Sequence, residues 1–164
     1  MTISNTALLD RHGHGRFIFY KLMTAIPVFV AVLAILRHAS SWYWVLAYAG
    51  VCLTHATIIY LSKCPHCHYY QTGDAKIHRC FFIWGTPKIR APSSKPAPKF
   101  LGVYVPIAML VMIAFPIFWL RFRWELLVIY LLSIVTLVYS ILLQECSRCP
   151  SFDCPNNTVP EEWM

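Results

Sequence analysis

Six cysteines spaced like metal ligands are the residues of this sequence best suited to chemistry. They form two groups, Cys64-x2-Cys67-x12-Cys80 and Cys146-x2-Cys149-x4-Cys154. A Cys-x2-Cys turn directs two thiolates to one centre, and its free backbone N–H groups can donate to the sulfurs. Three histidines, which are also common ligands, accompany the first group: His66, His68 and His78. We therefore expect a metal site whose ligands come from these nine residues.

The spacing leaves the ligand set and the metal open. The natural tetrahedral set takes two thiolates from each turn: Cys64, Cys67, Cys146 and Cys149. The remaining two cysteines would replace one of the four or form a second site with a histidine. Zinc is favoured because separated turns and nearby histidines suit it, whereas the compact CxxCxxC run of a ferredoxin is absent. The alternatives are an iron–sulfur cluster, a rubredoxin-type iron, or disulfides if the compartment is oxidising.

The two turns are similar to the knuckles of rubredoxins and zinc ribbons. The similarity covers about eight residues, Cys64 to Cys67 and Cys146 to Cys149. It implies no particular function, because many unrelated proteins carry such turns.

The composition is that of a membrane protein. Apolar residues make up 58% of the 164 residues and charged residues 13%, against about 25% charged in soluble domains. Four segments reach the roughly 20 apolar residues that a spanning helix needs, and we predict helices over 17–36, 42–61, 100–120 and 126–144. The first 16 residues lack the pattern of a cleavable signal peptide, so we expect the first helix to be retained.

The links between these helices are unequal in length. Residues 37–41 and 121–125 are short enough to make helical hairpins. Residues 62–99 form a polar loop with cysteines and histidines, which becomes proline-rich over 87–98, and residues 145–164 form a cysteine-containing tail. We therefore expect one all-α integral membrane domain over 1–164, built from two helical hairpins.

The distribution of positive charge predicts the orientation. Eleven of the 14 Lys and Arg residues lie on the side of the termini and the long loop, and the other three are Arg37, Arg121 and Arg123. The positive-inside rule then places the termini, the loop and the cysteines in the cytoplasm. The net charge of +7 is explained by this topology and by contact with lipid, without a nucleic acid partner.

The two halves of the chain repeat one arrangement, in which a helical hairpin leads into a CxxC turn. Cys64 and Cys146 are 82 residues apart, as are the hairpin tryptophans Trp42 and Trp124. Each half crosses the membrane twice, so the halves have the same orientation, which is a parallel repeat. A pseudo-two-fold axis along the membrane normal would bring both turns to the same face.

His55 is a histidine inside a predicted span. An ionisable residue at that depth is a functional hypothesis by default, so we consider it a candidate cofactor ligand. The alternative is a neutral histidine that bonds to a neighbouring helix. Cys52, in the same span, reads as a small apolar residue.

We interpret the chain as a non-enzymatic, metal-binding membrane module, favoured to hold zinc. It would serve as an accessory factor or small subunit of a larger membrane complex, or as a homo-oligomer. An electron-transfer subunit with iron is the first alternative. The second alternative is a transporter of soft metal ions or thiols. Its donors inside the membrane would be limited to Cys52, His55, Met109 and Met112. Thiol catalysis by a CxxC turn also stays open.

Overall fold

Four long helices dominate the computed structural model, which describes residues 8, 12–39, 42–71, 76–95, 97–151 and 157–160. They are α1 (His14–His38), α2 (Tyr43–Ile58), α4 (Phe100–Leu120) and α5 (Trp124–Ser140). In the described ranges, four helical stretches are long and apolar enough to cross a membrane: His14–His38, Tyr43–His66, Phe100–Leu120 and Trp124–Arg148. The prediction of a largely helical chain with four helices able to span a membrane is confirmed, and it is compatible with a multi-pass membrane protein.

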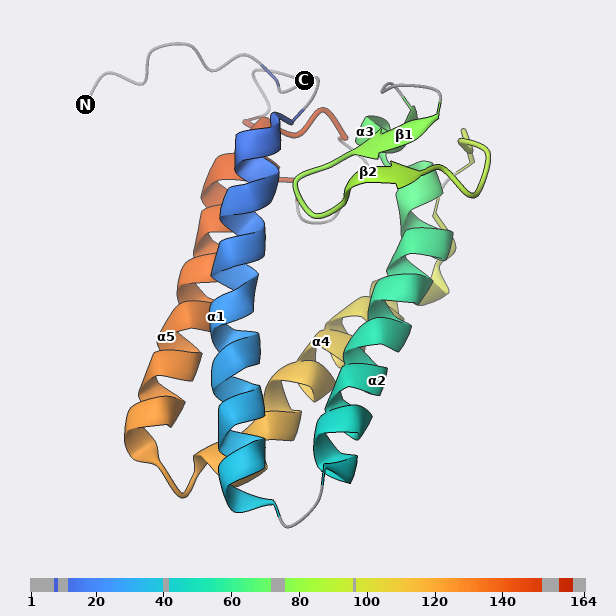
Figure 1. Cartoon of the computed structure of the whole chain (residues 1–164). Coiled ribbons are helices and arrows are strands. Elements are labelled where there is room, and N and C mark those ends of the chain that lie inside the picture. Colours follow the sequence, from blue (N-terminus) through green and yellow to red (C-terminus); the bar gives the residue numbers. More distant parts are fainter. Residues whose placement is uncertain are drawn as a thin grey trace, which may run out of the picture.

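The helices pack most tightly at the end opposite the cysteine turns. α1 lies against both α4 and α5, and α2 lies against α4 (Figure 1). Small residues of α1, Ala31 and Ala34, are fully buried there and let the backbones approach closely. The rest of this core consists of larger side chains: Val30, Ile35, Tyr48, Trp119, Leu120 and Tyr130.

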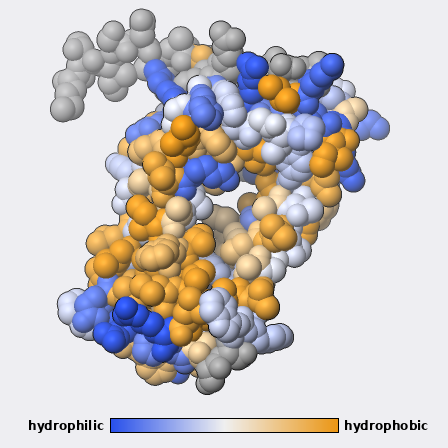
Figure 2. Space-filling view, viewed as in Figure 1, coloured by the Kyte–Doolittle hydropathy of each residue, from blue (hydrophilic) through white to orange (hydrophobic). Residues whose placement is uncertain are grey.

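The outer surfaces of the helices are apolar, as contact with lipid requires. Phe29, Leu53, Leu110 and Val135 are among the large side chains that stay exposed. Figure 2 shows hydrophobic residues over much of this face and a hollow between α2 and the helices beside it. A surface of this kind is stable in a bilayer, where lipid tails replace water.

A small β-hairpin covers the end of the bundle where α1 and α2 have diverged (Figure 1). Its strands, β1 (Ile77–Arg79) and β2 (Trp84–Pro87), pair antiparallel. The connection between them reaches the start of α1, where the ring centroids of Phe81 and Tyr20 are 5.0 Å apart. The short helix α3 (His68–Gln71) lies between the end of α2 and this hairpin.

The structure differs from the sequence-based expectation in two details. The long polar loop, in which no helix or strand was predicted, contains this hairpin and α3. In addition, the second and fourth helices do not end before their cysteines. Each continues through a π-helical and a 3-10 turn, so that Cys64 and Cys146 belong to the helix ends.

Candidate metal centre

The two CxxC turns have the same backbone conformation. In the first, a π-helical turn (Ile59–Lys63) precedes a 3-10 turn (Cys64–His66), and the second repeats this order with Ile141–Glu145 and Cys146–Arg148. The φ and ψ angles are −85° and 139° at Cys67, and −82° and 124° at Cys149. Each turn is closed by a bond from the second cysteine's N–H to the first cysteine's carbonyl, at 2.9 Å and 3.5 Å respectively.

Cys80 directly follows β1 and joins the first turn. Burial is the largest cause that raises the pKa of its thiol, and the nearby thiols of Cys67 and Cys64 add to it. Backbone N–H groups of Phe82 and Ile83 that donate to the sulfur oppose the shift, and the resulting pKa is about 12. Such N–H donors are typical of cysteines that bind metal as thiolates. The hairpin thus brings a third sulfur into the neighbourhood of the first turn.

His78 lies on the same strand, two residues before Cys80, and is 1% exposed. Its Nδ1 is 3.2 Å from the carbonyl oxygen of Ile83, to which it donates when the ring is neutral. Its Nε2 is buried and has no hydrogen-bond partner. Burial lowers the pKa of the ring, with the positive charge of Lys88 adding to the shift, so the neutral form is favoured. A neutral imidazole oriented in this way leaves Nε2 as a free electron-pair donor.

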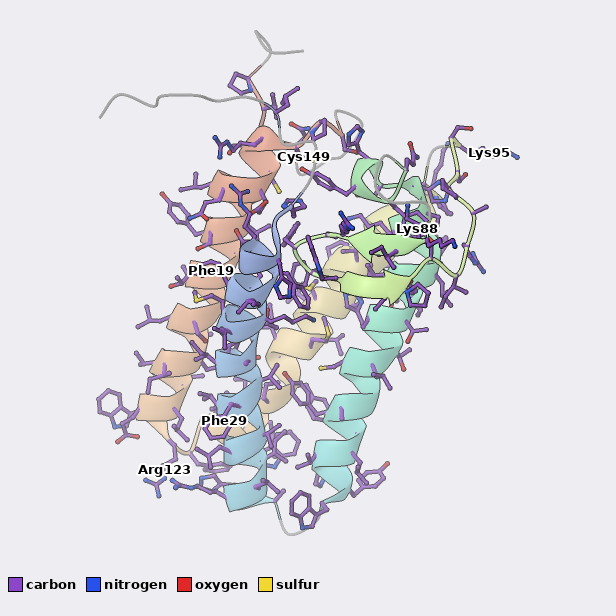
Figure 3. The ribbon with its side chains drawn as sticks, turned by 45° about the horizontal axis from the view of Figure 1, so that its top comes forward. Phe19, Phe29, Lys88, Lys95, Arg123 and Cys149 are labelled. Atoms are coloured by element: carbon purple, nitrogen blue, oxygen red, sulfur yellow. The ribbon has the colours of Figure 1, made fainter. Side chains whose placement is uncertain are left out.

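Tyr69 lies between the two CxxC turns. Its hydroxyl is buried without a hydrogen-bond partner of regular geometry. Burial raises its pKa, and the thiol of Cys149, then that of Cys67, raises it further, which requires both sulfurs to be nearby. The second turn, seen at Cys149 in Figure 3, therefore approaches the first across this ring.

A buried ion-pair network joins the start of α1 to the second turn. Glu145, which directly precedes Cys146, is 3% exposed. Its Oε2 lies 3.1 Å from His12 Nδ1 and 3.2 Å from Arg16 Nη1. His12 is 2% exposed, and its Nε2 has no hydrogen-bond partner. Sequence reasoning missed this pair, because nothing in the local pattern connects positions 12 and 145.

The other predicted ligands lie in different surroundings. His66 Nδ1 is 2.6 Å from the carbonyl oxygen of Lys95, and the ring of His68 packs edge-on against Tyr69 at 5.9 Å. Cys154 lies outside the described residues. Among the described residues, Cys52, Cys64, Cys67, Cys80, Cys146 and Cys149 are not joined in disulfides.

His55 lies in the membrane-spanning part of α2, nine positions before Cys64. Its ring centroid is 5.6 Å from that of Tyr104 in α4, and its Nδ1 is buried without a partner. It lines a cavity of about 520 Å³ between these two helices, together with mostly apolar residues such as Val51, Ile107 and Val111. Its role as a cofactor ligand stays a prediction.

Within the part of the chain that the structure describes, no three His, Cys, Asp or Glu side chains are already arranged to hold a metal ion. The predicted set of Cys64, Cys67, Cys146 and Cys149 is therefore not preassembled. What the fold does place at the cysteine-rich end is a set of buried polar atoms without hydrogen-bond partners, namely Nδ1 and Nε2 of His12, Oη of Tyr69 and Nε2 of His78. Each unsatisfied group of this kind costs about 1–3 kcal/mol, so their clustering at one end calls for an explanation.

Comparison with known proteins identifies no relative, since no family model, curated protein or solved structure matches the chain.

Proposed function

We propose that this protein is a membrane-anchored zinc-binding module whose primary site is formed by Cys64, Cys67, His78 and Cys80. The observation that carries the proposal is the buried, unpartnered Nε2 of His78, two residues before Cys80, whose thiol lies near those of Cys64 and Cys67. Three thiolates and one imidazole are an established ligand set for structural zinc. The thiols would move into the coordination shell as the ion binds.

The surroundings of His78 favour metal binding over a purely structural role. Successive side chains of a strand alternate in direction, so His78 and Cys80 share one side of β1 and its extension. The ring centroids of His78 and Tyr70 are 5.0 Å apart, and the thiol of Cys64 contributes to the raised pKa of Tyr70, after burial. His78 is thus two residues from Cys80 in the sequence, and its ring contacts Tyr70, a neighbour of the first turn. The Ile83 carbonyl would accept a hydrogen bond from Nδ1 of His78 and so orient the ring, as such acceptors do for metal-bound histidines.

The role of the ion would be to fix the hairpin on the end of α2. The strands of the hairpin are only three and four residues long and form little core of their own, and metal binding supplies folding free energy in such cases. We propose that the rigid cap then serves as a contact surface, with the protein acting as an accessory factor or small subunit of a membrane complex.

We further propose that the two halves are related by a pseudo-two-fold axis along the membrane normal. Support comes from the matching backbone of the two turns and from the helix contacts. The first helix of each half packs on the second helix of the other, α1 on α5 and α4 on α2, while α1 and α4 pack on each other. This is the pattern that such an axis would produce.

We place the cysteine-rich end in the cytoplasm, because most positive side chains lie there. Figure 3 shows Lys88 and Lys95 with Cys149 at one end and Arg123 at the other. Labelling of intact cells with a membrane-impermeant maleimide tests the orientation. Little labelling of Cys64 before lysis, and labelling after it, is expected. Labelling of this cysteine from outside would overturn the assignment.

The test of the metal proposal is elemental analysis with an absorption spectrum, on full-length protein purified in detergent without oxygen. We expect zinc, a colourless sample, and loss of one equivalent in Cys64→Ser and His78→Gln. Cys52→Ser is the matched control, because Cys52 packs against the helix core far along α2, and it should retain all metal. Absence of metal from the wild type, or unchanged content in both variants, would contradict the proposal.

Iron is the competing metal, and the same spectrum distinguishes it. A red or brown sample with visible charge-transfer bands would indicate a rubredoxin-type iron or an iron–sulfur cluster. The position of Tyr69 between Cys67 and Cys149 favours a second arrangement, in which the ion is shared between the turns. In that case Cys64→Ser and Cys146→Ser would each remove all the metal.

A further inference from the structure

We propose that the second turn carries its own metal site, with Cys146 and Cys149 as thiolate ligands and His12 Nε2 as the nitrogen ligand. The site would take a borderline divalent cation such as Zn²⁺, because mixed thiolate and imidazole donors suit that class. It lies at the junction of the N-terminal segment and the end of the last helix, and it does not depend on the site on the hairpin.

The first argument is the environment of His12 itself. The ring is 2% exposed, its Nδ1 lies 3.1 Å from a carboxylate oxygen of Glu145, and neither Nδ1 nor Nε2 makes a hydrogen bond of regular geometry. Metal-bound histidines almost always donate their other ring N–H to a carboxylate or carbonyl, which fixes the ring and makes the bound nitrogen more basic. Glu145 occupies that supporting position.

A simple ion pair explains this arrangement less well. Arg16 already supplies a positive charge to Glu145, with Nη1 at 3.2 and 3.3 Å from its two oxygens. An ion pair between His12 and Glu145 would also leave the buried Nε2 of the ring without a partner. A cation bound at Nε2 would supply the partner that this buried atom lacks.

The second argument is what surrounds the ring. Its centroid is 4.2 Å from that of Tyr69 and 5.1 Å from that of Phe81. Tyr69 lies beside the Cys149 thiol, and Glu145 is the residue immediately before Cys146. His12 is therefore in contact with neighbours of both cysteines of the second turn. The N–H of Thr158 donates to the Cys146 carbonyl at 3.3 Å, which fixes the turn from its other side.

The two sites would have the same design. Each would combine a CxxC turn at the end of a helix with a histidine whose Nδ1 lies beside an acceptor oxygen, that of Ile83 at 3.2 Å in one case and that of Glu145 at 3.1 Å in the other. In each, the histidine comes from a segment outside the turn. A metal at the second turn would tie the N-terminal segment to the last helix, whereas a metal on the hairpin ties the loop to α2.

Metal stoichiometry in the full-length, detergent-purified protein tests the inference and separates it from the proposed function. We expect about two Zn²⁺ per chain. His12→Gln and Cys149→Ser should each lower this to about one, and His78→Gln should remove the other one. His14→Gln is the matched control, because His14 is exposed and stacks on Phe17, and it should keep both ions.

Substitution with Co²⁺ provides a readout that does not depend on stability. The second site should contribute sulfur-to-cobalt charge-transfer absorption that is lost in Cys149→Ser and shifted in His12→Gln, in protein that still elutes as the folded species. One ion in the wild type, lost only with His78→Gln, would overturn the second site and leave the proposed function intact. Two ions with an unchanged cobalt spectrum in His12→Gln would overturn the assignment of His12.

Discussion

His12 Nδ1 lies 3.1 Å from Glu145 Oε2, so the segment before the first helix is held by the last residue before the second CxxC turn. Both side chains are almost completely buried. Because Arg16 joins the same carboxylate, the network closes the bundle at the cysteine-rich end, where the helices have few apolar contacts with one another.

Replacement of Glu145 by Leu should destabilise the protein. It leaves His12 buried and Arg16 unpaired, and removal of one partner from a buried pair costs about 3–5 kcal/mol. Because the Arg16 side chain is 36% exposed, solvent screening reduces the expected loss to about 1–3 kcal/mol. Thermal unfolding in detergent measures it, and Glu125→Leu, in the exposed first turn of α5, is the control. An equal melting temperature for both variants would show that the network contributes nothing.

The adjacent tyrosines of α3 should respond differently to loss of the hydroxyl. Tyr70 donates to the Arg90 carbonyl at 2.6 Å and accepts from the Arg90 N–H at 3.2 Å. Tyr70→Phe should therefore cost about 1–2 kcal/mol. Tyr69 has a buried hydroxyl with no regular partner, so Tyr69→Phe should be close to neutral in the metal-free protein. Chemical unfolding of the two variants checks this, and a larger loss for Tyr69→Phe would contradict the described contacts.

The spanning helices could be predicted because their signal is local and strong. A run of about 20 apolar residues is recognisable without tertiary information, and the third helix was predicted as 100–120, matching α4. The hairpin could not be predicted in the same way. Its strands are three and four residues long and carry no alternating pattern, so their pairing depends on packing against Tyr20 and Phe17 of α1.

In the candidate site, too, the sequence identified the residues with a local spacing pattern and missed those that only tertiary contacts bring together. The CxxC turns and Cys80 were apparent from spacing. The contributions of His12, Tyr69 and Glu145 were not, because they depend on contacts between residues far apart in sequence. His78 was predicted among three histidines, and only its burial and its bond to Ile83 distinguish it from His66 and His68.

Close packing at the other end of the bundle predicts an effect of side-chain size. Ala34 is fully buried between α1 and its neighbours, so Ala34→Leu should force the helices apart and cost about 1–3 kcal/mol. Ala25, on the same helix, is exposed, and Ala25→Leu should be neutral because the added side chain meets lipid. Melting temperatures in detergent or nanodiscs compare the two. Equal tolerance at both positions would indicate that the described core is not formed.

The apparent zinc affinity of the hairpin site should increase with pH. Burial holds the pKa of Cys80 at about 12 in the metal-free protein, so this thiol is protonated at neutral pH and must release its proton when it binds metal. The pKa of His78 is lowered, so the ring is already neutral above pH 6.5 and contributes no proton there. Each thiol that is deprotonated on binding adds about one logarithmic unit of affinity per pH unit.

Competition with a chromophoric chelator between about pH 6.5 and 8 measures the slope of the zinc affinity against pH. This slope should fall by about one in Cys80→Ser and stay unchanged in Cys52→Ser. A slope that is the same in Cys80→Ser and the wild type would exclude Cys80 as a ligand.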